Sequence, residues 1–246
     1  MELKEGIIVK TIKYKESSKI VYLLTKEGLF SGLVRNCLNL KSKNYSYSHE
    51  AILIGFDIQK SKNNNSFDII TSGKVIDNFI NIHGNYNKLL VILEMFSIVM
   101  ECCHNVDNYE KLYDLTALVL KMINSNTLET NDKFYLLIFK LKLLYLSGVG
   151  PHVTECVECG KKDYVSFSIE NGGVVCREHK KSSLISSETT EILKILYLGK
   201  IDLFTEEIFK SFDEYYYDVA NIVEKYYEHH LPLNSKTKKI IKNLKV

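Results

Sequence analysis

The residues with the most distinctive chemistry in this sequence are four thiol and imidazole side chains arranged in two pairs. They are Cys156 and Cys159, followed after sixteen residues by Cys176 and His179. Two residues separate the members of each pair, and a turn of this length brings two soft donors to one side of a metal ion. The pattern predicts one structural zinc ion per chain, because four protein ligands leave no open position for water.

The identity of the fourth ligand is open at this stage. His152 lies close in sequence to Cys156 and could replace His179. A site with three protein ligands and a water would suit a zinc-dependent hydrolase or deaminase, with Glu158 or Glu178 moving protons. A deaminase requires a His-x-Glu motif ahead of its Pro-Cys-x-x-Cys motif, and this sequence lacks that combination.

Other catalytic motifs are also missing from the sequence. It contains no Gly-rich phosphate loop, no His-Glu-x-x-His motif and no Gly-x-Ser-x-Gly motif. Cys37, Cys102 and Cys103 occur at the ends of apolar segments, where buried structural thiols are expected. We therefore expect a protein that is not an enzyme.

The positive charge is almost wholly lysine, because only two of the 32 cationic residues are arginine. Ammonium groups attract phosphate and do not read base edges as the planar guanidinium does. Residues 1–80 hold twelve cationic and eight acidic side chains, residues 81–234 hold fifteen and twenty-two, and residues 235–246 hold five lysines and no acid. This segregation favours a nucleic-acid surface in the first 80 residues, although exposed lysines also serve solubility alone.

The candidate DNA-binding residues are lysines, one arginine and two tyrosines of this N-terminal part. The cations would attract phosphates, and the tyrosines would offer stacking platforms for unpaired bases. Two tyrosines in a Ser- and Asn-rich loop are expected to face solvent, whereas Tyr14 shares a strand face with Ile12 and is expected in the core. The candidates are Lys10, Lys13, Lys15, Lys19, Arg35, Lys41, Lys43, Tyr45 and Tyr47.

The elements that must position these residues follow from the apolar periodicity. The first 80 residues contain five runs rich in Ile, Val, Tyr and Phe, separated by Gly, Ser and Asn breaks, which predict strands. Five short antiparallel strands in about 80 residues suit a closed barrel of the OB type. The expected strands cover residues 5–14, 18–26, 29–36, 51–59 and 67–79.

After residue 81 the apolar spacing changes to the period of a helix. Helices are predicted around residues 89–103, 112–122 and 134–145, and again around 187–196 and 209–227. A segment at about 151–183 lacks helical spacing, contains the two ligand pairs and is interpreted as a zinc ribbon. The sequence thus predicts an α+β protein, with an OB-type barrel domain over residues 1–80 and an α-helical domain over 81–246 that carries the ribbon.

Several motifs of the chain resemble those of the bacterial RecO recombination mediator family, and the resemblance extends along essentially the whole sequence. The most specific part is the succession Gly148-x-x-Pro151, Cys156-x2-Cys159 and Gly172-Gly173-x-x-Cys176. Looser matches are the start Gly6-Ile7-Ile8-Val9-Lys10 and the pair Lys41-Ser42. Two positions depart from the family pattern: cysteine is common where His179 stands, and the usual basic run is reduced to Arg35-Asn36-Cys37-Leu38-Asn39-Leu40-Lys41.

The resemblance implies a protein that binds single- and double-stranded DNA and anneals complementary strands. With RecR as a partner, such a protein helps RecA to replace single-strand binding protein on DNA, so contact with the RecA filament is indirect. A protein-only adaptor, whose barrel never meets DNA, is the alternative. The five lysines of residues 235–246 are a second candidate DNA site.

No segment is expected to span a membrane. The longest apolar stretch, residues 89–100, is 12 residues long and contains Glu94, whereas a membrane helix needs about 20 apolar residues. The start of the chain has two acids in its first five residues and no apolar h-region, so it does not indicate a signal peptide. We expect a cytoplasmic, nucleoid-associated protein.

Overall fold

The structure of the chain is a computed structural model that describes residues 3–62, 66–180 and 185–231. It divides into two units. The first contains the described residues up to His104 together with Asn108–Ser125, and the second contains Asn105–Asp107 and the described residues from Asn126 onward. The predicted domains, residues 1–80 and 81–246, were defined by expected fold and function. The two units are defined by contacts, so the predicted boundary near residue 80 stays a prediction.

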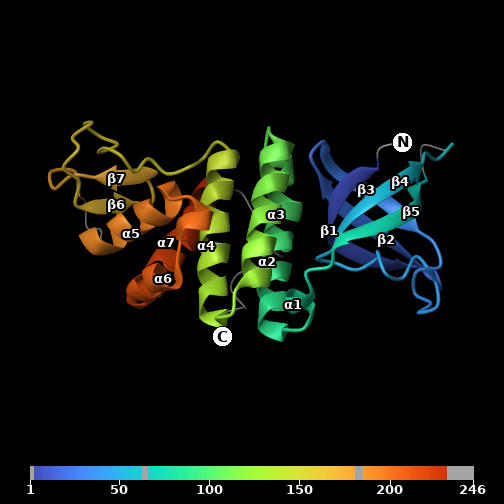
Figure 1. Cartoon of the computed structure of the whole chain (residues 1–246). Helices are drawn as coiled ribbons and strands as arrows, with labels where there is room; N and C mark the ends of the chain where they lie inside the picture. The colour runs from blue at the N-terminus through green and yellow to red at the C-terminus, as the bar shows by residue number, and fades with distance from the viewer. Residues whose placement is uncertain (1–2, 63–65, 181–184, 232–246) are drawn as a thin grey trace. The chain divides into compact units, whose positions relative to one another are not determined.

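The first unit is built on five strands that close into a barrel in the order β1-β2-β3-β5-β4 (Figure 1). All neighbouring strands are antiparallel except β3 and β5, which are parallel and pair Gly32 with Asp68 and Leu33 with Ile69. The barrel confirms the predicted OB-type architecture. Its strands are β1 (Lys4–Tyr14), β2 (Ser18–Thr25), β3 (Gly28–Val34), β4 (Leu53–Gln59) and β5 (Asp68–Asp77).

The barrel core consists of the inward positions of these strands, but burial does not simply alternate, because residues 6–9 of β1 and 53–56 of β4 are all buried and Ile12 is exposed. Ile8, Leu23, Ile54 and Phe56 are among its fully buried side chains. Three helices belong to the same unit, and Asn85 caps the second by accepting a hydrogen bond from the Lys88 amide. They are α1 (Ile80–His83), α2 (Tyr86–Cys102) and α3 (Tyr109–Ser125), with a short 3-10 helix η1 (Cys103–Asn105) after α2.

The second unit contains four helices and the small ribbon sheet (Figure 1). Ser186 begins α5 by accepting a hydrogen bond from the Thr189 amide, so the ribbon ends at a well-capped helix. None of the helices in the described ranges is long and apolar enough to cross a membrane. The elements are α4 (Glu129–Leu146), β6 (Ser166–Ser168), β7 (Gly173–Val175), α5 (Ser187–Leu198), η2 (Ile201–Leu203), α6 (Glu206–Phe212), η3 (Asp213–Tyr215) and α7 (Tyr216–His230).

The predicted helix over residues 209–227 is wrong in one respect, because the chain breaks into α6, η3 and α7. The aromatic packing explains the break. The ring of Phe134 on α4 stacks on Phe209 with centroids 4.8 Å apart, and it meets Tyr216 edge-on at 5.1 Å. The tighter 3-10 turn allows residues on both sides of it to contact the same buried ring.

Candidate metal centre and nucleic-acid interface

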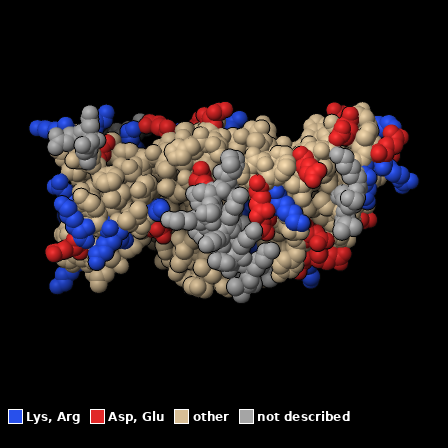
Figure 2. All heavy atoms as spheres, turned by 180° about the vertical axis from the view of Figure 1, so that it is seen from behind, with Lys and Arg blue, Asp and Glu red and all other residues tan. Residues whose placement is uncertain are grey.

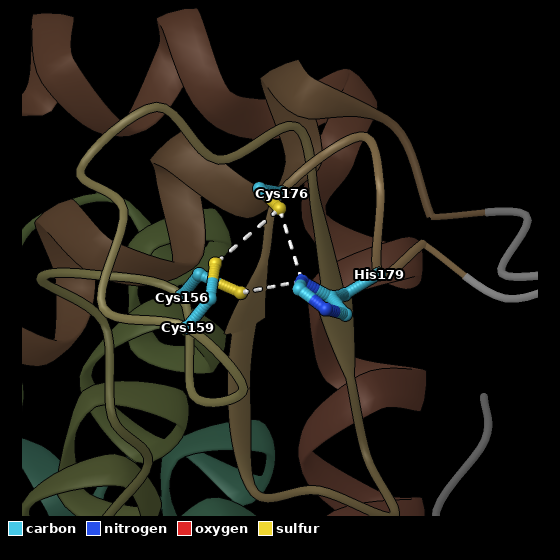
Figure 3. Close-up of side chains that lie close together, drawn as sticks. All are labelled: Cys156, Cys159, Cys176 and His179. Carbon is cyan, nitrogen blue, oxygen red and sulfur yellow. Dashed lines mark hydrogen bonds between the residues drawn. The ribbon is translucent and has the colours of Figure 1, made fainter.

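The ligand pairs lie on turns that flank the β6–β7 hairpin (Figure 3). The amide of Gly160 donates to the Cys156 carbonyl at 2.8 Å, and the positive φ of Gly160, 71°, allows the chain to reverse directly after Cys159. The second turn is closed by the His179 amide, which donates to the Cys176 carbonyl at 3.1 Å. These short turns point all four side chains toward one another.

The four predicted ligands form one cluster, in which every donor atom lies within 4.8 Å of the others. The Cys159 and Cys176 sulfurs are 3.8 Å apart, and His179 Nδ1 lies 3.3 Å from the Cys176 sulfur and 3.8 Å from that of Cys156 (Figure 3). Zn–S bonds of about 2.3 Å and Zn–N bonds of about 2.0–2.1 Å place tetrahedral ligands about 3.8 Å (S to S) and about 3.5 Å (S to N) apart. The donor set therefore fits a tetrahedral ion.

The electrostatics of the cluster lower the pKa of the Cys156 and Cys176 thiols. The Lys161 amide acts in the same direction on Cys159, but burial and the two neighbouring sulfurs outweigh it and raise the pKa of that thiol. Burial raises the pKa of the Cys156 thiol, but hydrogen bonds from the amides of Cys176, Glu158 and Cys159 outweigh it and lower that pKa to about 6. The Cys176 thiol raises the pKa of the His179 imidazole through their hydrogen bond, against the effect of burial. A cluster that stabilises sulfur anions is chemically suited to a cation.

His152 is not part of the cluster. Its backbone pairs with β7, where its amide donates to the Gly172 carbonyl at 2.9 Å and its carbonyl accepts from the Val174 amide at 2.9 Å. Its ring Nε2 lies 3.8 Å from a Glu155 carboxylate oxygen. The structure therefore brings His179, and not His152, to the three cysteines.

The candidate lysines of the barrel lie on β1, β2 and the turn between them. Lys13 is paired directly with Lys19 across the two strands. The Lys19 ammonium donates to the Ser48 carbonyl at 2.7 Å, and that of Lys10 lies 5.9 Å from the ring centre of Tyr22. On the face shown in Figure 2, Lys and Arg side chains gather over the barrel, at the left of the view.

The loop between β3 and β4 holds the next candidates. Lys41 and Lys43 are exposed, as predicted. Tyr47, however, is not the exposed platform that the loop composition suggested, because its side chain is only 3% exposed and packs in the barrel core. Burial raises the pKa of its phenol, with a smaller effect from Cys37. Tyr45 is half-buried, and its ring meets that of His49 edge-on at 4.6 Å.

A cleft of about 610 Å³ opens beside the β1–β2 turn, and we call it the turn cleft. Its lining includes Lys15 and Arg35 of the predicted set together with Tyr14 and Phe67. The sequence analysis expected Tyr14 in the core and did not select Phe67. The signal was their position, since Tyr14 directly precedes a turn and Phe67 directly precedes β5. The lining includes Tyr14, Lys15, Arg35, Asn36, Ser61 and Phe67.

Comparisons with known proteins agree with this architecture. The family model described as recombination protein O, N terminal, matches residues 1–79, and the one described as recombination protein O, C terminal, matches residues 83–239. The chain is 30% identical over 206 residues to the DNA repair protein RecO of Caldicellulosiruptor saccharolyticus, covering 81% of this chain and 80% of that protein. It is 27% identical over 270 residues to the DNA repair protein RecO of Lactobacillus helveticus, covering 100% and 98%. The chain therefore belongs to the RecO family of DNA repair proteins.

Proposed function

We propose that this protein is a non-enzymatic recombination mediator that binds single- and double-stranded DNA and anneals complementary strands. Together with RecR, it would help RecA to load onto DNA coated by single-strand binding protein. Work on chromosomal DNA would place it at the nucleoid. Membership of a DNA repair family supports this proposal in general, and the charge arrangement of the barrel supports it in particular.

The observation that carries the proposal is that the candidate lysines of the barrel have no carboxylate partner among the described residues. Within the same described part of the chain, two other lysines of this unit are paired with a carboxylate, whereas Lys60 and Lys74 are not. Lys4 lies 2.7 Å from a Glu27 oxygen, and Lys26 lies 3.3 Å from Glu110. The unpaired candidates include Lys13 and Lys19, which face each other although like charges directly opposite are unfavourable in a sheet. The unpaired candidates are Lys10, Lys13, Lys15, Lys19, Lys41 and Lys43.

Ammonium groups without a carboxylate partner suit the physical demands of annealing. Two DNA strands repel each other through their phosphates, and bound lysines neutralise that charge and release counterions. The contacts carry no sequence information, so any complementary pair can be brought together. Base pairing then supplies the specificity without covalent chemistry by the protein.

For the cluster of Cys156, Cys159, Cys176 and His179 we propose one structural zinc ion. The S-to-S and S-to-N distances support zinc, and the complete set of four ligands leaves no position for a reactive water. Such an ion would hold the two turns together and contribute to folding. This arrangement favours the mediator over a zinc-dependent hydrolase or deaminase.

A titration of labelled single-stranded DNA with the full chain, at 50 and 200 mM salt, tests the proposal. We expect binding that weakens steeply with salt, and rapid duplex formation when the complementary strand is added. The Lys4→Ala variant is the control. Its DNA affinity should equal that of the natural protein, because Lys4 is already paired with Glu27. Absence of DNA binding at low salt would leave the protein-only adaptor as the correct function.

A further inference from the structure

The turn cleft has a size that suits a small ligand or one unit of a polymer. Its volume of about 610 Å³ lies within the range of roughly 300–1,000 Å³ that is typical of ligand pockets. None of its described lining residues is acidic, whereas Lys15 and Arg35 both contribute to it. The ligand that fits it is therefore an anion with apolar surface.

Two aromatic rings supply the apolar surface of the cleft. Phe67 is 39% exposed, so part of its ring is accessible to a ligand. It meets Tyr14 edge-on, with ring centres 6.3 Å apart and ring planes at 72°. Because the two ring planes are far from parallel, a planar base can stack on only one of them, and Phe67 offers that face while Tyr14 lies edge-on beside it.

The cations of the cleft lie close to these rings. The Lys15 ammonium is 5.4 Å from the ring centre of Tyr14. Lys15 and Asn36 both have left-handed backbones, with φ values of 54° and 50°, and they are two of the four described non-glycine residues with positive φ. Left-handed residues of this kind are held in place only where the surrounding structure requires them, and they concentrate at binding sites.

The cleft is also connected to the basic loop between β3 and β4. The Asn44 side-chain amide donates to the Arg35 backbone carbonyl at 2.8 Å. Lys41 and Lys43 belong to the same loop as Asn44 and are exposed. A chain of phosphates that passes Lys15 and Arg35 can therefore continue to these lysines.

We propose that the turn cleft receives one unpaired base of single-stranded DNA, which stacks on Phe67 and meets Tyr14 edge-on while Lys15 and Arg35 bind the adjoining phosphates. This inference rests on the proposed DNA-binding function and deepens it. A base inside a duplex is stacked on its neighbours and cannot enter the cleft. The site thus gives the protein a preference for unpaired nucleotides, which annealing must first bind and then release.

The test measures binding of the full chain to labelled oligo-dT and to a duplex of equal length. Replacing Phe67 with Ala should weaken binding of the single strand by about 5-fold or more, the effect of losing one stacked base. It should leave the salt dependence and the duplex affinity unchanged, because no phosphate contact is lost. Phe67→Trp should restore binding, since the larger ring keeps a stacking face.

The matched control is Ile76→Ala, because Ile76 is an exposed apolar residue of β5 that does not line the cleft.

A second probe uses oligonucleotides in which scattered bases are replaced by abasic sites. The natural protein should bind them more weakly than intact DNA, and the Phe67→Ala variant should distinguish the two less. A competition with free thymidine monophosphate separates strand binding from binding of a mononucleotide, and we expect no displacement at micromolar concentrations.

Two failures are distinguishable. If the natural protein binds no DNA, the proposed function itself fails. If the natural protein binds and anneals DNA while Phe67→Ala and Phe67→Leu, both folded by their melting curves, bind single strands as Ile76→Ala does, the inference alone is overturned. Displacement by the mononucleotide would also overturn it.

Discussion

The phenol of Tyr47 donates a hydrogen bond to the side-chain oxygen of Asn44 at 2.6 Å, and this pair anchors the loop between β3 and β4 in the barrel. The side-chain amide of Asn44 in turn donates a hydrogen bond to the Arg35 backbone carbonyl. The ring of Tyr47 fits against Gly73 of β5, where a Cβ atom would lie 2.5 Å from the nearest ring carbon. The loop that presents the candidate DNA lysines is therefore positioned by a buried tyrosine.

Replacing Gly73 with Ala should destabilise the protein, because the new methyl group and the Tyr47 ring cannot occupy the same space. The expected loss is about 1–3 kcal/mol in the free energy of unfolding, as for other overpacked cores. Urea denaturation monitored by circular dichroism measures it. Gly84→Ala is the control, since Gly84 has φ −79° and its added Cβ would meet only the Ile80 carbonyl at 3.4 Å.

A double-mutant cycle assigns this cost to Tyr47. In a Tyr47→Ala background the Gly73→Ala change should cost far less, because the space beside the strand is then empty. Equal costs in both backgrounds would show that the tyrosine ring does not pack against Gly73.

Replacing His179 with Ala should release the metal, whereas replacing His152 with Ala should retain it. The reason is that His179 Nδ1 lies 3.3 Å from the Cys176 sulfur, while the His152 ring lies beside Glu155. Metal analysis of protein purified without chelator should find one zinc per chain in the natural protein and in His152→Ala. Full zinc content in His179→Ala would contradict this ligand assignment.

Removal of the metal should destabilise the second unit, because a structural ion contributes to folding. We expect Cys159→Ser to lower the midpoint of thermal unfolding, with His152→Ala as a control outside the cluster. An unchanged midpoint after verified loss of zinc would show that the ion is not structural.

Replacing Lys13 with Glu should make the barrel more stable and its DNA binding weaker. The change converts a like-charged cross-strand pair with Lys19 into an opposite-charged one, which is worth about 0.2–1 kcal/mol. If Lys13 contacts a phosphate as proposed, the same change removes that contact and adds a repulsive charge. Unfolding curves and DNA titrations on one protein sample measure both effects, and a parallel loss of stability and affinity would argue for a purely structural lysine.

Stability should depend on pH through His49. Burial lowers the pKa of this imidazole below its ordinary value of 6.5, and the positive charge of Lys19 and the neighbouring His83 lower it further, against a hydrogen bond to the Tyr45 backbone. Between the folded and unfolded pKa values the unfolded chain binds more protons, so the free energy of unfolding rises with pH. Stability from this residue is present above pH 6.5 and is lost as the pH falls below it.

The His49→Gln variant isolates that contribution. Its unfolding free energy should fall less than that of the natural protein between pH 7 and pH 5. An identical pH dependence in the two proteins would contradict the lowered pKa.

The strands and the metal cluster were predictable because their signals are local. The apolar pattern predicts a first strand over residues 5–14, and the structure has β1 at residues 4–14. Ligand spacing selects the three cysteines and leaves His179 and His152 as alternatives, between which the structure decides for His179. The fate of Tyr47 was not predictable, because a Ser- and Asn-rich loop gives no indication that one of its tyrosines enters the barrel. That position depends on Gly73, which is 26 residues away.

The turn cleft was hidden from the sequence for a related reason. Tyr14 ends β1 and Phe67 directly precedes β5, so the two rings, which lie 6.3 Å apart, come from segments far apart in the sequence. The left-handed backbone of Lys15 is equally invisible, because lysine has no particular preference for positive φ. Sequence reasoning therefore found the charged residues of the surface and missed its aromatic residues.

The salt dependence of single-strand binding tests most directly whether the barrel is the DNA-binding domain. Changing Lys41 and Lys43 together to Ala should flatten the plot of log affinity against log salt by about one to two units, at roughly 0.7 per lost phosphate contact, and slow annealing. The comparison is deletion of residues 235–246, whose five lysines lie outside the described residues. We predict that the double change reduces the slope and that the deletion does not. If the deletion abolishes the salt dependence while the double change leaves it intact, the barrel is not the DNA site.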